Sequence, residues 1–548
     1  KNGLDLLFFQ WPNCIKEESE YRNDTLVRRT SYHRNCNIKM VESFRNGQRE
    51  GYTKEARSGA DLDPEKSFAV RTALRWNPSP SLDVQLNADR GYHNMPVVVH
   101  SSLGANFDPE RIELDSAPRE DRDYWGVSLD AAYDLGSVKL ISVTGYRGAR
   151  LTNVIDTDAG PTRAIQFSQF DATAQWSQEL RLNSAPKTRL QWLAGIYLFQ
   201  EDADTFSPIF LDFTENLGLP SPTTQTIDAS NRTKAFALFG QASFKLTDQL
   251  TISGGLRWSK EQKIFTFNQQ FTIDIPPLFS SYPRSRQKTR WTDVSPRIAI
   301  DYRASDNLLF YASYSDGFKS GGSTSVSLIT TPVPNVFAPE SLEAFEAGIK
   351  SDWFNDDLRV NITAFHYDYK DLQVRTTDAF GFLIVRNAAN ARVDGLELEM
   401  SAQPIRGLDL TAIAAVLDAR YGEFIDPVTL ADYSGTRLNR APKLKASFGA
   451  QYAFRLESGA EFAVRGEYEH MSRLYHQPGN LTAFSRAPTH LFNGRLAYRT
   501  ADRRWSIALL AKNLTNERRI GHNFVVLGEP RSTITPPRTL VLEVCFTR

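Results

Sequence analysis

The sequence predicts an all-β protein, a transmembrane antiparallel β-barrel, and three observations lead to this fold class. Apolar and polar residues alternate along most of the 548-residue chain, as they do in strands with two different faces. Short and long connections take turns between the alternating segments. The longest clean apolar run, residues 410–417, is far shorter than the roughly 18 residues of a membrane-spanning helix.

Complete alternation marks the clearest strands. In residues 82–89 an apolar side chain and a polar one follow each other at every step, and residues 358–364 and 461–469 repeat this pattern. Weaker copies occupy residues 252–258, 492–498, 505–511 and 540–546. We count about nineteen alternating segments of roughly 9–12 residues, and a tilted strand of this length crosses a bilayer.

The connections between these segments are of two kinds. The short ones are rich in Gly, Pro, Asn, Asp and Ser, which tight turns favour, and they occupy residues 77–80, 135–136, 184–187, 247–248, 304–306, 355–357, 404–407, 457–459 and 501–503. The long ones occupy residues 92–121, 148–173, 201–228, 262–287, 317–338, 370–392, 420–440, 470–488 and 516–536. Bacterial outer-membrane barrels have short periplasmic turns and long extracellular loops, so this rhythm favours that architecture.

Aromatic residues near the ends of strands support a membrane barrel, because such barrels carry aromatic girdles at both interfaces. They are Trp76, Tyr92, Trp125, Tyr146, Trp176, Trp258, Trp353, Tyr452 and Trp505. A large soluble propeller or sandwich is the alternative. A propeller would repeat its motifs every 40–50 residues or so, and the sequence has no such repeat.

Composition narrows the function classes. Equal numbers of basic and acidic residues, 64 of each, argue against a nucleic-acid partner, which requires a concentrated basic face. Three cysteines, Cys14, Cys36 and Cys545, form no dense disulfide framework, and neither a CxxC nor an HExxH spacing indicates a metal site. A secreted β-rich enzyme is disfavoured because no nucleophile, base and orienting acid form a known arrangement.

Several strings along the chain are distinctive. The two longest are residues 307–319 (NLLFYASYSDGFK) and 337–350 (FAPESLEAFEAGIK), and others are residues 178–182, 192–197, 394–399, 512–517 (KNLTNE) and 528–531 (GEPR). In their order and spacing these strings resemble the barrel of the TonB-dependent outer-membrane receptors, which are active transporters of iron–siderophore complexes, cobalamin and some carbohydrates. The resemblance covers roughly residues 51–548, which we expect to form the receptor barrel.

The resemblance also implies what the N-terminal part should contain. The family's barrel usually has about 22 strands around a plugged lumen, whereas about 19 strands are counted here. We therefore expect three strands and the N-terminal plug to be missing. Residues 1–50, which are charged and lack clear alternation, are expected to form an atypical segment, either mis-translated or disordered.

The function implied by the resemblance is active uptake of a scarce ligand across the bacterial outer membrane, with a ferric siderophore as the first candidate. Cobalamin or a carbohydrate taken up by the same mechanism, and a passive porin-like channel, are the alternatives. The implied partners are outer-membrane lipid, the ligand, and the TonB complex of the inner membrane, reached through a plug. We expect no enzymatic activity and no cofactor.

Candidate ligand contacts are loop residues that combine aromatic stacking with charge, because siderophore chelates are large, polar and often anionic. They are Tyr92, His93, Phe318, Lys319, Arg420, Tyr421, His470, Arg473, Tyr475 and His476. Each of them has an alternative role in the interface belt or in loop packing. We expect no catalytic residue and no metal ligand, and the spacing of His470 and His476 is not that of a metal site.

Two further motifs receive structural interpretations. Residues 513–516 are expected to end a strand through Asx-type turns. Residues 317–322 contain glycines but lack the order of a phosphate-binding loop, so we do not expect them to bind phosphate.

Overall fold

The protein is described by a computed structural model. The structure describes residues 17–22, 25–32, 38–49, 54–55, 65–95, 101–102, 111–116, 118–158, 160–161, 163–186, 188–218, 220–274, 279–324, 335–377, 383–426, 430–526 and 529–547. Cys14 and Cys36 lie outside the described residues. In the described part of the chain, none of the helices is long and apolar enough to be a membrane span.

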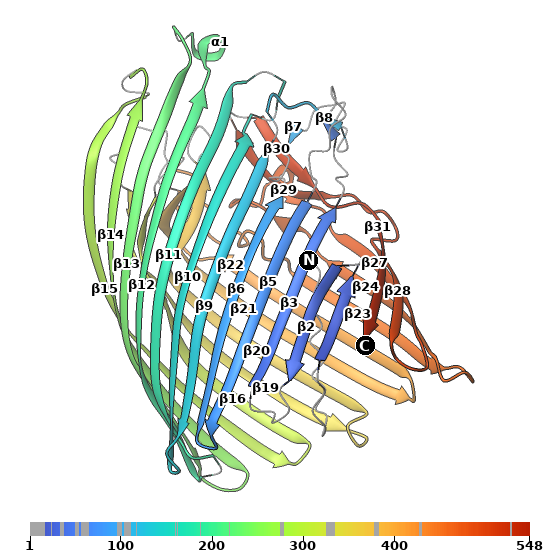
Figure 1. The fold of residues 1–548 in the computed structure, drawn as a ribbon. Coiled ribbons are helices and arrows are strands. Elements are labelled where there is room, and N and C mark those ends of the chain that lie inside the picture. Colours follow the sequence, from blue (N-terminus) through green and yellow to red (C-terminus); the bar gives the residue numbers. More distant parts are fainter. Residues whose placement is uncertain are drawn as a thin grey trace.

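One antiparallel sheet of 22 strands forms the barrel (Figure 1). Each strand pairs with the next one along the chain, and β1 pairs with β31, so the sheet closes on itself. The strands are β1 (Glu17–Arg22), β2 (Thr25–Tyr32), β3 (Ile38–Arg49), β5 (Glu65–Ser79), β6 (Leu82–Met95), β9 (Arg119–Asp134), β10 (Val138–Asp156), β11 (Ile165–Ser184), β12 (Leu190–Leu211), β13 (Thr223–Lys245), β14 (Leu250–Phe271), β15 (Tyr282–Ser305), β16 (Leu308–Lys319), β19 (Glu340–Trp353), β20 (Leu358–Thr377), β21 (Leu383–Ile405), β22 (Leu408–Tyr421), β23 (Leu444–Arg455), β24 (Glu461–Met471), β27 (Thr489–Arg499), β28 (Trp505–Lys512) and β31 (Thr539–Thr547).

Short elements occupy the connections at one end of the barrel. They are β4 (Lys54–Glu55), β7 (Ser101–Ser102), β8 (Arg111–Ile112), α1 (Thr214–Leu217), β17 (Gly322–Thr324), β18 (Asn335–Phe337), β25 (Leu474–Tyr475), η1 (Thr482–Phe484), β26 (Ser485–Arg486), β29 (Ile520–Val526) and β30 (Glu529–Ile534). We call this end, which carries the β6–β9, β10–β11, β22–β23, β24–β27 and β28–β31 connections, the loop end. The opposite end, with the short links, is the turn end.

The predicted fold class is confirmed, and the sheet contains three strands more than the alternation indicated. The additional strands are β1, β2 and β3, within the segment that was expected to be atypical. Their sequences are rich in charge, for example EESEYR in β1 and TLVRRTSY in β2, so two distinct faces are hard to see there.

The two faces of the barrel wall differ in polarity. On β14 and β15 the exposed Leu256, Ile298 and Ile300 share one face, and similar apolar residues continue around the outer surface. On the other face Arg297, Asp301, Tyr311, Glu346 and Lys350 line a hollow of about 410 Å³. An apolar outside and a polar inside are what alternation produces in a membrane barrel.

Aromatic residues follow the predicted girdles. Of the nine named from the sequence, all except Trp258 are exposed. Trp125 and Tyr146 are neighbours on adjacent strands, with ring centroids 5.2 Å apart.

Several strands are much longer than the sequence indicated. Residues 201–228 and 262–287 were expected to be loops, but β12, β13, β14 and β15 continue through most of them and reach 22–24 residues each. At about 3.3 Å per residue such strands measure roughly 70 Å, more than twice the hydrocarbon thickness of a bilayer. The extension is stabilised by a buried core at the loop end that contains Ile165, Ile209, Leu211, Phe213, Ile227, Phe265, Phe267, Phe271 and Phe279.

Candidate functional site

Tyr92 and His93 lie near the loop end of β6 and face opposite sides of the barrel wall. Tyr92 shares the outer face of the strand with Leu86, and its ring stacks on that of Phe68 at a centroid distance of 6.1 Å. Successive side chains on a strand alternate, so His93 is on the lumen side. Tyr92 therefore has the position of a girdle residue.

Phe318 and Lys319 end β16, and the segment after them is held by its neighbours. Lys319 Nζ lies 3.3 Å from Glu340 Oε1, and its side chain is 61% exposed. Lys263 Nζ donates hydrogen bonds to Ser320 Oγ and to the Gly321 carbonyl, both at 2.9 Å. The glycine-containing segment is thus tied to β14, which gives it a structural role.

Arg420 and Tyr421 occupy very different environments at the end of β22. Tyr421 is buried, its ring packs against Phe424 with centroids 4.9 Å apart, and its hydroxyl donates to Asn439 Oδ1. Arg420 is exposed, and its Nε donates to the Asp418 carboxylate at 2.9 and 3.1 Å. Arg420 also donates from Nη1 to the Gly435 carbonyl at 3.1 Å, so it is held at the surface, whereas Tyr421 packs the loop.

His470 does not meet His476, because it lies on β24 beside another histidine. The rings of His470 and His490 have centroids 4.6 Å apart. In the β24–β27 connection, Arg473 Nη1 donates to Ser485 Oγ at 2.8 Å, and the Tyr475 carbonyl accepts from the Arg440 amide at 2.8 Å. Arg473 and Tyr475 thereby link neighbouring parts of the loop end.

His476 meets His522 instead, and this pair joins two loops. Their Nδ1 atoms lie 3.4 Å apart, with ring centroids at 5.1 Å. Arg440 Nη2 lies 3.5 Å from His522 Nδ1, and Arg486 donates to the carbonyls of Ile520 and Gly521 at 2.9 and 2.5 Å. The group connects the loops that follow β22, β24 and β28.

The surroundings of the histidine pair keep it uncharged near neutral pH. His476 is 5% exposed, and burial lowers its pKa to about 4, helped by His522 and by the nearby guanidinium groups of Arg486 and Arg440. Burial also lowers the pKa of His522, as do Arg440 and Arg486. A neutral imidazole can donate one hydrogen bond and accept another, so the two rings can share one.

The structure therefore brings only part of the predicted set together. His476, Arg473 and Tyr475 belong to one loop cluster with Arg440, Arg486 and His522, three residues that no pattern in the sequence indicates. His476 and His522 are 46 residues apart, and only the order of the strands places them side by side. The sequence shows that several histidines lie in loops, but it does not indicate which of them meet.

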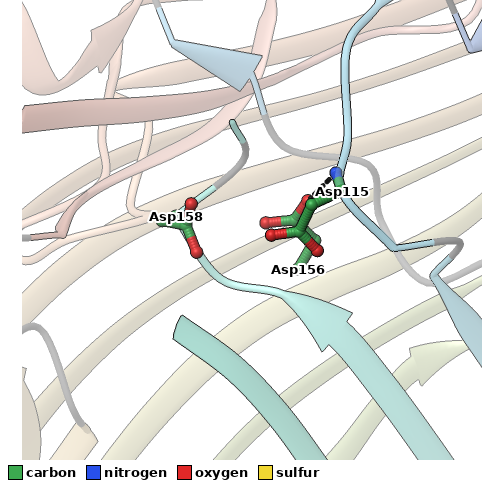
Figure 2. Close-up of side chains that lie close together, drawn as sticks. All are labelled: Asp115, Asp156 and Asp158. Carbon is green, nitrogen blue, oxygen red and sulfur yellow. Dashed lines mark hydrogen bonds between the residues drawn. The ribbon is translucent and has the colours of Figure 1, made fainter. Parts of the chain in front are cut away.

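An acidic cluster at the loop end was also missed. Asp115, Asp156 and Asp158 each offer an oxygen, and these oxygens lie within 4.8 Å of one another (Figure 2). Burial raises the pKa values of Asp115 and Asp158. The spacing of Asp156 and Asp158 was visible in the sequence, but Asp115 lies 41 residues before Asp156.

A closed antiparallel barrel with an apolar outer face, a polar inner face and aromatic girdles defines the protein as a transmembrane β-barrel. Residues 86–514 match the family described as TonB dependent receptor-like, beta-barrel. The chain belongs to this family of receptors, whose barrels are outer-membrane proteins.

Two curated relatives are receptors by name. The chain is 31% identical over 162 residues to the metal-pseudopaline receptor CntO of Pseudomonas aeruginosa. The aligned stretch covers 30% of this chain and 21% of that protein. The chain is 25% identical over 295 residues to the ferric-pyoverdine M114 receptor PbuA of a Pseudomonas species. This second alignment covers 52% of this chain and 33% of that protein. The matches thus span about a fifth and a third of the lengths of these relatives.

Solved structures share the fold. The ferric yersiniabactin uptake receptor FyuA from Yersinia pestis superposes with a TM-score of 0.81 at 15% identity, covering 97% of this chain and 79% of that one. The siderophore receptor PiuA from Acinetobacter baumannii gives a TM-score of 0.74 at 14% identity, covering 97% and 81%. At this identity the likeness concerns the fold alone.

Proposed function

We propose that this chain forms the barrel of a TonB-dependent receptor that takes up a ferric siderophore across the outer membrane. The observation that carries the proposal is the family match over residues 86–514 of a closed barrel. The names of PbuA, FyuA and PiuA support a siderophore as cargo, because all three refer to siderophores or ferric siderophores.

The geometry is compatible with capture at the loop end and passage through the lumen. The exposed cations Lys319 and Arg420 lie there, paired with Glu340 and Asp418, and an anionic chelate would compete with these carboxylates for them. The lumen wall is polar along the hollow lined by Arg297 and Lys350. Tyr421 and His476 are buried, so in this role they would order the loops around the ligand. Lipid would contact the apolar outer face, and the inner-membrane TonB complex would supply the energy.

The test is uptake of iron-55 by a Gram-negative host that lacks its own siderophore receptors and expresses the full-length protein. One catecholate and one hydroxamate siderophore, each loaded with iron-55, serve as probes. We expect uptake of at least one of them, and we expect it to disappear when the host's tonB gene is deleted. Leakage of small sugars that is independent of TonB would instead support a porin-like channel. TonB-dependent uptake of labelled cobalamin without uptake of either siderophore would show that cobalamin is the transported ligand.

Charge-removing variants refine this test. We expect Lys319→Gln combined with Arg420→Gln to raise the siderophore concentration for half-maximal uptake severalfold, because two cations that attract an anionic chelate are lost. Arg504→Gln is the matched control, since Arg504 is an exposed cation at the turn end. Equal uptake by both variants would remove Lys319 and Arg420 from the ligand site.

A further inference from the structure

A group of basic side chains lies on the outer face of β13, β14 and β15, just beyond the apolar surface on the loop-end side. These three strands run side by side (Figure 1), and the exposed Leu256 and Val294 belong to the apolar surface there. Farther toward the loop end, five cations of this face are exposed. They are Lys234, Lys260, Arg286, Lys288 and Arg290. We call these five residues the basic patch.

The register of the strands places the basic patch on the outer side of the wall. Trp258 pairs with Val294, and the pairing of β14 with β15 continues from there to Arg286 without a bulge. Alternate positions beyond Trp258 and Val294 therefore stay on the outer face. Lys234 of β13 pairs with Gln262, which is one of these positions. The five cations thus occupy neighbouring positions on one surface.

Elsewhere on the outer face near the loop end, basic side chains have carboxylate partners. Arg90 Nη2 of β6 lies 2.9 Å from Asp123 Oδ2 of β9, and Lys370 of β20 forms an ion pair with Glu343 of β19. Such pairs cancel most of the charge locally, so these parts of the wall present little net charge to the surrounding lipid.

The charges of the basic patch are not cancelled in this way. Among the residues that the structure describes, none of the five forms an ion pair, and Arg290 Nε donates to the neutral Gln262 Oε1 at 3.1 Å. The charge of Lys234 acts on Asp202, but that carboxylate is paired with Arg232, which we leave out of the patch for this reason. A net positive surface remains, and such a surface attracts anions.

An apolar hollow of about 650 Å³ adjoins the basic patch on the same outer face. Its lining is mainly apolar and includes Leu180, Leu238, Leu256 and Trp258. Ala194 and Gly240 also line it, and their small size leaves room between the leucines. Phe236 packs edge-on against Trp258, with ring centroids 5.9 Å apart, and pairs with Lys260. The hollow therefore ends where the basic patch begins.

An apolar hollow beside uncompensated cations fits an amphiphile that has acyl chains and an anionic headgroup. From Lys260 to Arg286, which is opposite Thr266, the patch extends over roughly 20 Å of strand at about 3.3 Å per residue. A single phosphate is too small to meet cations spread over this length, so the headgroup should carry several anionic groups. A phosphorylated glycolipid has such a headgroup.

We propose that the outer face of β13–β15 binds one molecule of lipopolysaccharide, with an acyl chain in the hollow and its phosphates against the basic patch. Lipopolysaccharide is the phosphorylated glycolipid of the outer leaflet, and the long loops of an outer-membrane barrel face that side. The proposal rests on the outer-membrane placement of the proposed function, but it is independent of the ligand that the receptor transports.

The experiment uses the whole protein, refolded without lipopolysaccharide into dodecyl maltoside micelles. Lipid A that carries both of its phosphates is the probe, and native mass spectrometry measures how much of it the protein binds at each concentration. We expect one tightly bound lipid A per chain. Lipid A from which both phosphates have been removed should bind at least tenfold more weakly, because the basic patch then lacks an anionic partner. Equal binding of the two lipids would overturn the proposal.

Variants of the basic patch locate the phosphates. Lys288→Gln combined with Arg290→Gln should weaken binding of lipid A at least tenfold, because two cations that attract its phosphates are lost. Lys288→Arg combined with Arg290→Lys retains both charges and should bind like the parent protein, which separates loss of charge from loss of fold. Arg406→Gln combined with Arg504→Gln is the matched control, since both are exposed cations at the turn end. Equal binding by the two glutamine pairs would count decisively against the patch.

A further variant tests the hollow. Ala194→Phe fills part of it and should weaken binding of lipid A severalfold, because less room is left for an acyl chain. Ala364→Phe is the control, since Ala364 is an exposed alanine on the outer face of β20, outside the hollow. Binding by Ala194→Phe that matches this control would show that the acyl chain does not occupy the hollow, contrary to the proposal.

Discussion

His476 and His522 place their Nδ1 atoms 3.4 Å apart, with their rings at 77° to each other, and so join the connections that follow β24 and β28. The two guanidinium groups beside them, those of Arg440 and Arg486, disfavour a proton on either ring. The contact between the two loops therefore requires neutral imidazoles.

We expect this contact to weaken as the pH falls from about 6.5 toward about 4. The pKa of His476 is about 4 in the folded protein and 6.5 for an ordinary histidine. Between these two pH values the opened loop binds more protons than the closed loop. The contact therefore contributes its whole stability above about pH 6.5 and loses it as the pH falls toward about 4. Hydrogen exchange of the His476 amide, which donates to the Phe484 carbonyl at 2.9 Å, measures the opening.

The matched variants are His522→Gln and His93→Gln. The first removes one titrating ring of the pair and should flatten the pH dependence of amide protection, whereas the second changes a histidine of β6 outside the pair and should leave that dependence intact. Equal protection of the parent protein at pH 7 and pH 5 would contradict this account.

Gly348→Ala should destabilise the barrel by about 1–3 kcal/mol, because it overpacks the wall. A Cβ at Gly348 would lie 2.6 Å from the ring of Tyr311, which is the paired residue on β16 and hydrogen-bonds Thr363 through its hydroxyl. Gly466→Ala is the control, since no atom lies within 4 Å of its added Cβ. Guanidinium unfolding in lipid vesicles measures both, and equal losses would show that Tyr311 moves aside freely.

Leu256→Arg tests which face of the wall contacts lipid. Leu256 is 54% exposed on the outer face, and an arginine near the middle of a bilayer lowers barrel stability by about 2–4 kcal/mol. Ser253→Arg, three residues away on the lumen side, should lower it by less than about 1 kcal/mol because its side chain meets water. The same unfolding assay compares the two variants. A larger decrease in stability for Ser253→Arg than for Leu256→Arg would mean that the lipid-facing and lumen-facing sides have been assigned the wrong way round.

Asn513→Ala should lower the free energy of unfolding by about 2–4 kcal/mol. Asn513 is buried with a φ of 51°, its Nδ2 donates to the carbonyls of Glu517 and Pro536, and its Oδ1 accepts from the Glu517 amide. The segment ends β28 as predicted, but the predicted Asx-type turn is wrong: the turn is closed by the backbone, with the Asn516 amide donating to the Asn513 carbonyl at 2.8 Å, and Asn513 Oδ1 accepts from the amide four residues on rather than two. Asn513→Asp keeps the acceptor oxygen and tolerates the backbone conformation, so it should lower the free energy of unfolding by less than Asn513→Ala does. Equal decreases for the two variants would count against the role of the acceptor.

The fold was largely predictable because most barrel strands, though not the charge-rich β1 and β2, alternate apolar and polar residues that face lipid and lumen. Residues 82–89 show this alternation completely, and β6 contains them. The extensions of β12–β15 were missed because a strand was taken to be as long as a membrane crossing, whereas Phe265, Phe267 and Phe271 continue to alternate and pack on neighbouring hairpins beyond that length. The candidate sites were predictable only in part. The partners of His476 and Asp156 lie 46 and 41 residues away, and strand order alone brings them together.

The closure of the sheet depends on one strand pairing that joins the two ends of the barrel sequence, β1 with β31. Every strand of the barrel except at the seam pairs with its neighbour along the chain, so hairpins can be added one after another, and each closes a loop far shorter than the whole chain. The pairing of β1 with β31 joins Glu20 to Thr547 and Tyr21 to Phe546 across almost the whole chain. That single step has the highest entropic barrier in assembly, and its short register makes it the first place where a closed barrel would part.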